Sequence, residues 1–251
     1  MPKSKIVTRT VMGLAAVFAA VAAGASLEWS GYKPFDRDQG PNLLCTIDPT
    51  CRQMNDAEIA MAKDLYGDSI NYNSVKIFDR RYMGFMGKGR WMSPNGSIYN
   101  DIVAERGFDY TKTSWQRRSL MHELAHVWQV QRGVDVRHEA VIAYVQSGFN
   151  YSATYGYTLN DHPWFLSYNL EQQADMLEDY DALRRKFRED IAGKAMDTPK
   201  RYGGDFTAQA KQTCKALAAY EQKIEQVLPL TPQEGCDYFR RPAKTPKPVQ
   251  S

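Results

Sequence analysis

The sequence has little excess charge of either sign, since 32 lysine and arginine residues stand against 29 aspartate and glutamate residues. Lys3, Lys5 and Arg9 account for the difference, because residues 1–25 contain no acidic side chain. The rest of the chain is therefore balanced, and this balance gives no broad electrostatic basis for binding DNA or RNA. We expect no nucleic-acid partner.

The N-terminal region lacks an apolar run long enough to span a membrane. The run from Val11 to Ala23 has 13 residues, whereas a membrane helix needs about 20. Basic residues precede this run and Ala23-Gly24-Ala25 ends it, an order that is typical of a secretory signal peptide. We predict a signal peptide over residues 1–25. An uncleaved N-terminal anchor is the alternative, and it would then be the only membrane contact that we expect.

Cysteine is also scarce, with four residues, and all of them follow the predicted signal peptide. Their even number fits an oxidising compartment, where disulfides persist. None has the C-x-x-C spacing of a redox or zinc site. Proximity in the sequence favours one disulfide between Cys45 and Cys51 and another between Cys214 and Cys236. Four free buried thiols are the alternative.

The composition excludes wholesale disorder and a polytopic membrane protein, because 43% of the residues are hydrophobic and 24% are charged. We predict a helix-rich α+β fold with a single domain over residues 55–240, an extended lead-in over 26–54 and a disordered tail over 241–251. A turn signal at residues 94–96 predicts a hairpin or small antiparallel sheet. Apolar spacing and capping residues predict helices near 55–67, 113–133, 136–146, from 170 onward, and 205–228.

The second of these helices contains His122-Glu123-Leu124-Ala125-His126. Four residues advance a helix by about 400°, so both histidines project from one face and can bind one zinc ion. Glu123 lies beside that face, where its carboxylate can accept a proton from a water molecule that the metal activates. The alternative is an amphipathic helix whose histidines are satisfied by hydrogen bonds. An apolar stripe would bury this helix: Leu120, Leu124, Val127 and Trp128.

A zinc site of this kind requires a third protein ligand. The residues at positions 129 and 132 do not fit the metzincin pattern, and those at 145 and 146 do not fit thermolysin-like spacing. Glu171 is the best later candidate, because a preceding asparagine and Asp175 resemble the Asn-Glu-x-x-x-Asp segment of glutamate zincins. Asp175 would accept a hydrogen bond from the free ring nitrogen of a histidine ligand. The alternative is that Glu171, Asp175 and Glu178 form a solvated acidic stripe.

Other residues could touch the substrate. His162 precedes Pro163 in an irregular aromatic segment, so we predict it as a catalytic residue at the rim of the cleft. His138 competes with it, although an ordinary position at a helix start is the simpler interpretation. Three tyrosines could donate a hydrogen bond to a tetrahedral oxyanion or simply pack at an edge: Tyr151, Tyr155 and Tyr157.

Several segments together resemble the Vgr-related (Rhs-element-associated) zinc metallopeptidase-like proteins of bacteria, which are often encoded with type VI secretion spikes. The matching segments are residues 56–80, 92–99, 121–129, 155–159 and 168–180. The resemblance implies a zincin-like fold with an HExxH active-site helix, zinc ligands His122, His126 and Glu171, and Glu123 as the catalytic base. This chain departs from that pattern in its export signal, its two candidate disulfides and Ala125, where threonine is common. These departures favour an envelope-resident protein over direct delivery by a spike.

We therefore expect an exported zinc metallopeptidase that hydrolyses amide bonds in protein or peptide substrates. Its expected location is periplasmic or secreted, within the bacterial cell envelope. Two alternatives stay open. One is a non-catalytic envelope binding or assembly module with structural zinc, and the other is an endopeptidase that cleaves the peptide cross-links of the cell wall.

Overall fold

The computed structural model describes residues 43–82, 91–101, 110–148, 150–192, 205–231 and 236. The chain divides into two units, Met1–Gly40 and Pro41–Ser251, and all described residues belong to the second. The predicted signal peptide, most of the lead-in and the predicted tail lie outside them. Among the described helices, none combines the length and apolar character that crossing a membrane requires.

The strands form one small sheet in the order β1-β2-β4-β3. Its pairings are antiparallel for β1 with β2, parallel for β2 with β4, and antiparallel for β3 with β4. The β3–β4 pair confirms the predicted hairpin. The sheet as a whole is mixed rather than antiparallel, because β4 runs parallel to β2. The strands are β1 (Cys51–Gln53), β2 (Lys76–Phe78), β3 (Trp91–Met92) and β4 (Ile98–Asn100).

Helices make up most of the described residues, and polar caps explain where three of them begin. Asn55 and Asn169 each form a capping box, with Glu58 and Gln172 respectively, and the Thr113 hydroxyl accepts from the Gln116 amide. The α-helices are α2 (Leu43–Ile47), α3 (Asp56–Tyr66), α4 (Ser114–Gln131), α5 (Val136–Gln146), α6 (Tyr151–Tyr155), α7 (Leu170–Lys186) and α9 (Asp205–Ile224). Shorter turns are η1 (Tyr72–Ser74), η2 (Phe165–Ser167) and the π-helical η3 (Phe187–Ala192).

Two elements differ from the sequence-based expectation. The lead-in is not wholly extended, since it contains α2 and β1, which the Cys45–Cys51 disulfide joins. The helix predicted to reach residue 228 ends at Ile224, where the chain passes into tight turns. The second predicted disulfide, Cys214–Cys236, is also present and ties α9 to the C-terminal segment.

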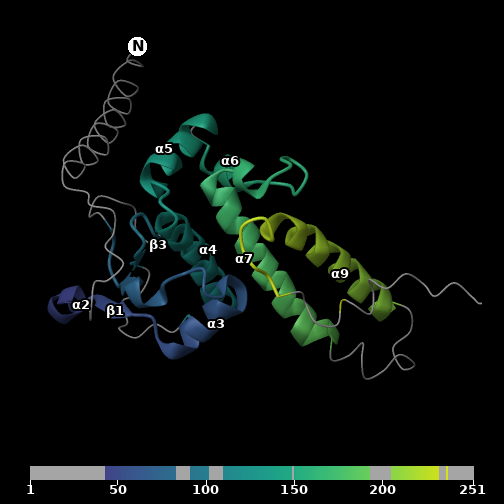
Figure 1. The fold of residues 1–251 in the computed structure, drawn as a ribbon, viewed down its shortest axis with the longest axis horizontal. Helices are drawn as coiled ribbons and strands as arrows, with labels where there is room; N and C mark the ends of the chain where they lie inside the picture. Colours follow the sequence, from purple (N-terminus) through teal and green to yellow (C-terminus); the bar gives the residue numbers. More distant parts are fainter. Residues whose placement is uncertain are drawn as a thin grey trace, which may run out of the picture. The chain divides into compact units, whose positions relative to one another are not determined.

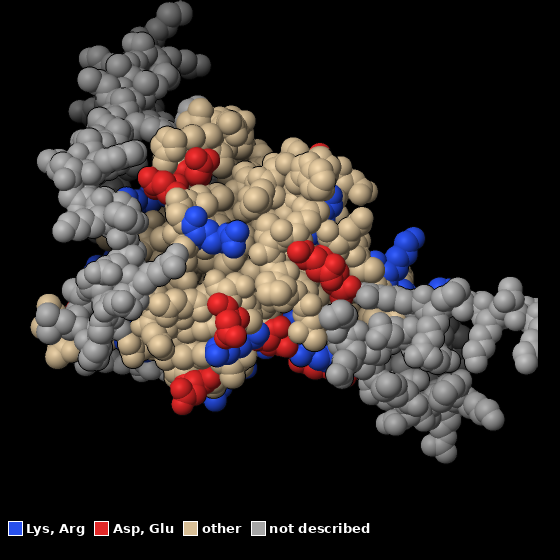
Figure 2. Space-filling view, in the orientation of Figure 1, with Lys and Arg blue, Asp and Glu red and all other residues tan. Residues whose placement is uncertain are grey.

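Helix α4 joins the sheet to the other helices. It packs along α7 over its most extensive interface, and it also contacts β3 and β4 (Figure 1). The predicted apolar stripe of α4 is buried, with Leu120, Leu124 and Val127 fully inaccessible. Helix α9 covers another part of α7. On the face drawn in Figure 2, acidic and basic side chains of the described residues are interspersed, as the balanced charge predicts.

Candidate metal centre

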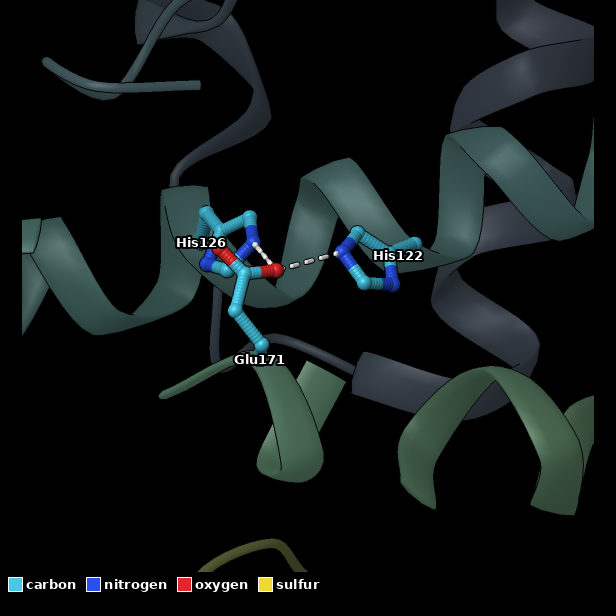
Figure 3. A group of neighbouring side chains, drawn as sticks. All are labelled: His122, His126 and Glu171. Carbon is cyan, nitrogen blue, oxygen red and sulfur yellow. Dashed lines mark hydrogen bonds and ion pairs between the residues drawn. The ribbon is translucent and has the colours of Figure 1, made fainter. Parts of the chain in front are cut away.

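Three side chains from α4 and α7 converge on one point (Figure 3). His122 and His126 lie one helical turn apart on α4, and Glu171 lies in the first turn of α7. The Oε2 atom of Glu171 is 3.2 Å from Nε2 of His122 and 3.3 Å from Nε2 of His126. The three side chains are 13%, 6% and 15% exposed, so the cluster is largely shielded but still borders solvent.

These donors fit a zinc ion. Two imidazoles and one carboxylate are a donor set that catalytic zinc sites use, and their ligand atoms lie within 4.8 Å of one another. In a tetrahedral zinc site with bonds of about 2.0–2.1 Å, neighbouring ligand atoms lie about 3.3 Å apart. The distances from Glu171 to the two imidazoles match that edge length. These two distances are thus compatible with a metal of this size.

His122 has acidic partners on its other ring nitrogen. Its Nδ1 atom is 2.9 Å from Oδ1 of Asp175 and 3.3 Å from Oε2 of Glu178. The structure therefore places Asp175 where the sequence predicted a partner for a ligand histidine. Glu178 was considered only as part of an acidic stripe, but its spacing of seven residues from Glu171 puts both on one face of α7. Its other carboxylate oxygen pairs with Arg118 at 2.7 Å.

His126 has amide partners instead. Its Nδ1 atom is 2.8 Å from Oε1 of Gln129, three residues later on α4. The Nε2 amide of Gln129 in turn donates to Oε1 of Gln173 on α7. Sequence reasoning missed both roles, because glutamine is seldom diagnostic and Gln129 served only to exclude the metzincin pattern. The i, i+3 spacing from His126 was the available signal.

Glu123 is buried at 5% exposure and accepts a hydrogen bond of 2.8 Å from the Ser93 hydroxyl. Burial raises the pKa of Glu123, while the two histidines and Ser93 oppose this rise. Ser93 lies in the β3–β4 turn, which approaches α4 closely at Gly96. This glycine has φ +81°, and a Cβ there would lie 3.3 Å from Val130. The sequence identified this turn but not its contact with Glu123.

The charges within the cluster are coupled. Burial alone would lower the pKa of His122 and His126, but their contacts with carboxylates outweigh it and raise both. Burial would raise the pKa of Glu171, but the imidazoles hold it well below its ordinary value. A metal ion binds neutral imidazole, so metal binding would compete with protons on these two histidines.

The remaining candidates lie in different surroundings. The ring of His162 packs edge-on against Tyr168 with centroids 4.8 Å apart, and its carbonyl accepts from Lys223 of α9. The structure does not include His162 in the three-ligand cluster. His138 is exposed near the start of α5.

Two of the three tyrosines can be placed. The ring of Tyr155 lies 6.0 Å from that of His122, so it borders the cluster. The hydroxyl of Tyr157 instead donates to Asp179 at 2.9 Å and lies 3.0 Å from the hydroxyl of Tyr220. The side chain of Tyr151 lies outside the described part of the structure.

No family model matches the sequence, but the chain is similar to a Vgr spike protein and to the solved structure of that protein's effector domain. One relative is the type VI secretion system spike protein VgrG2b of Pseudomonas aeruginosa, which is 39% identical over 140 residues. That match covers 55% of this chain but only 14% of the spike protein. The solved effector domain of VgrG2b has 29% identity and a TM-score of 0.54, and the match covers 69% of this chain and 90% of that domain.

Proposed function

We propose that this protein is an exported, zinc-dependent metallopeptidase that hydrolyses amide bonds in proteins or peptides. His122, His126 and Glu171 would be the zinc ligands and Glu123 the general base. The observation that carries the proposal is the convergence of the three donor atoms at distances that suit one tetrahedral ion. The relationship to an effector domain of a type VI spike protein supports an effector role.

Bound zinc supplies Lewis acidity, which polarises the scissile carbonyl and makes water a better nucleophile at neutral pH. Glu123 accepts the proton of that water and later donates it to the leaving amine. The Ser93 hydroxyl donates to one oxygen of Glu123, which leaves the other oxygen to carry the proton. Asp175 lies where it would accept the Nδ1 proton of His122, which would leave Nε2 to present its lone pair to a bound metal.

Export is part of the proposal. The expected signal peptide and the two disulfides favour an oxidising compartment outside the cytoplasm. The chain matches only 14% of VgrG2b, so carriage on a spike does not follow from the similarity. We propose a protein that acts in the cell envelope, periplasmic or secreted.

The test is a Glu123→Gln variant, compared with wild type for zinc content and for digestion of a peptide library, denatured protein and purified cell-wall material. We expect bound zinc to persist and turnover to fall at least about 100-fold, because the general base is lost. Glu139→Gln on α5 is the matched control, since Glu139 is half exposed and apart from the cluster. Undiminished hydrolysis by Glu123→Gln would exclude this mechanism, and wild type that binds no zinc would exclude the metal site.

A further inference from the structure

Two glutamines are buried between α4 and α7, beside the proposed zinc ligands. Gln129 is 1% exposed and Gln173 is 4% exposed. Each primary amide has two donor hydrogens and an accepting oxygen, and burying them without partners is costly. Both side chains have hydrogen-bond partners at each end, so their orientation can be worked out from the groups that they meet. We call Gln129 and Gln173 the amide pair.

Backbone carbonyls determine which way each amide faces. The Nε2 atom of Gln173 lies 2.7 Å from the Tyr168 carbonyl oxygen, and Nε2 of Gln129 lies 3.2 Å from that of Leu170. A carbonyl oxygen can only accept, so an amide nitrogen must face it at both places. The accepting oxygen of Gln173 therefore faces the Gln129 nitrogen, at 3.1 Å. The accepting oxygen of Gln129 must then face His126.

This direction determines the state of the histidine ring. Because Oε1 of Gln129 has no hydrogen to give, Nδ1 of His126 must be the donor across their 2.8 Å contact. In the neutral imidazole, the other nitrogen then carries the lone pair. That nitrogen is Nε2, which points to Glu171 and the centre of the three-ligand cluster. The amide pair thus selects the tautomer that can bind metal.

The same hydrogen bonds hold the start of α7. Leu170 and Tyr168 lie on either side of the Asn169 cap, and Glu171 comes directly after Leu170. A shift of this segment relative to α4 would move the Glu171 carboxylate and would also break the bonds from Gln129 to Leu170 and Gln173. The orientation of His126 and the position of Glu171 are therefore coupled through Gln129 and Gln173.

We propose that Gln129 and Gln173 are positioning residues of the zinc site: together they hold His126 as an Nδ1 donor and fix the helix start that carries Glu171. The inference rests on the proposed zinc site. A merely structural role would predict lost stability on substitution without a specific loss of zinc affinity. Gln131 provides the comparison, because it lies on the same helix and its amide also bridges to other segments, through Asn71 and Ser74.

The experiment measures zinc affinity by chelator competition at fixed pH for wild type, Gln129→Met, Gln173→Met and Gln131→Met. Methionine keeps the side-chain length but removes the amide. We expect the zinc affinity of Gln129→Met to fall about 10–100-fold, as for other partners of metal ligands, and that of Gln173→Met to fall less. Gln131→Met should stay within about twofold of wild type. The rise in Tm that zinc produces should shrink most in Gln129→Met, less in Gln173→Met and hardly at all in Gln131→Met.

A spectroscopic measurement addresses the tautomer directly. In zinc-loaded wild type and Gln131→Met, nitrogen-15 NMR should show a proton on Nδ1 of His126 that exchanges slowly with water. In Gln129→Met this proton loses its acceptor and should exchange faster. If Gln129→Met does not fold, the zinc affinity of Gln173→Met tests the inference instead. Wild-type zinc affinity in both variants would overturn the inference and leave the proposed function standing, whereas wild type that binds no zinc would overturn both.

Discussion

The buried carboxylate of Glu123 accepts a hydrogen bond from a hydroxyl, that of Ser93. The carboxylate of Glu171, by contrast, contacts two imidazoles. Ser93 is 2% exposed, so this bond is sheltered from water. Hydrogen bonds to charged groups are stronger than neutral ones, and burial increases the cost of losing them. The arrangement predicts that Ser93 helps to orient the proposed base, Glu123, and to keep it ionised.

Ser93→Ala should lower kcat about tenfold, a part of what general-base catalysis supplies, because the carboxylate would lose a fixed orientation. Zinc content should not change, since Ser93 has no contact with the three ligands among the described interactions. Steady-state kinetics with metal analysis measure both. Ser97→Ala is the control, because Ser97 is also buried in this turn. Equal kcat values for the two variants would contradict the orienting role.

Spacing along a helix explains what could be predicted about individual residues. His122, Glu123 and His126 form a local pattern, and Asp175 lies one turn after Glu171, so the sequence pointed to all of these. Ser93 reaches Glu123 only because the hairpin turn packs on α4, a contact that no local pattern encodes. Gln173 was missed for the same reason, since it comes from a different helix, whereas Gln129 had a local signal in its spacing from His126.

At the scale of secondary structure, the cap of α7 is expected to matter more than an ordinary cap. Asn169→Ala removes the capping box and should cost about 1 kcal/mol of stability. It should also weaken zinc binding, because Glu171 lies within the first turn that the cap orders. Asn55→Ala is the matched control, since Asn55 caps α3 in the same way. Asn169 also donates to the Thr154 carbonyl, so urea unfolding should show a loss at least as large for Asn169→Ala as for Asn55→Ala. Chelator competition should show reduced zinc affinity only for Asn169→Ala.

Asp64 of α3 faces arginines from three other helical elements: Arg117 of α4, Arg184 of α7 and Arg188 of η3. Burial would raise the pKa of Asp64, but these arginines outweigh it and lower the pKa. A carboxylate whose pKa is lower in the folded state stabilises the fold at pH values above its unfolded-state pKa. That contribution disappears as the pH falls through the folded-state pKa.

Asp64→Asn should therefore lower the free energy of unfolding at pH 7 by about 1 kcal/mol, a modest value because the group is partly exposed to solvent. The difference in the free energy of unfolding between the variant and wild type should stay constant down to about pH 4 and shrink below that pH. Urea titrations at several pH values measure it. Asp68→Asn serves as the control, because the Asp68 carboxylate is 95% exposed. A difference that grows on acidification would contradict the assigned sign.

The helices were more predictable than the sheet. Polar caps and apolar spacing are local, and they predicted α3, α4, α5 and the start of α7 close to their observed bounds. The strands have two or three residues each, too few for an alternating pattern to indicate their partners. Their mixed order depends on long-range pairing, as between Ile77 and Ile98.

At the scale of the whole chain, the Cys214–Cys236 disulfide closes a loop with a sequence separation of 22. On the chain-entropy model, a disulfide that closes a loop of this size contributes about 3 kcal/mol to the free energy of unfolding. The double variant Cys214→Ser, Cys236→Ser should lose about that much stability in urea unfolding, and reduction of wild type should lose at least as much. An unchanged midpoint would show that the folded chain does not depend on this link.

The proposed zinc ligands come from two helices that the chain joins through residues 132–169, and this connection has a consequence for proteolysis. An ion shared by α4 and α7 clamps the two ends of that segment, and its removal frees the ends to separate. The stretch 138–183 contains no lysine or arginine but many aromatic residues, so chymotrypsin rather than trypsin would detect the release. Chelated protein should be nicked between α5 and α7 well before the zinc-loaded form.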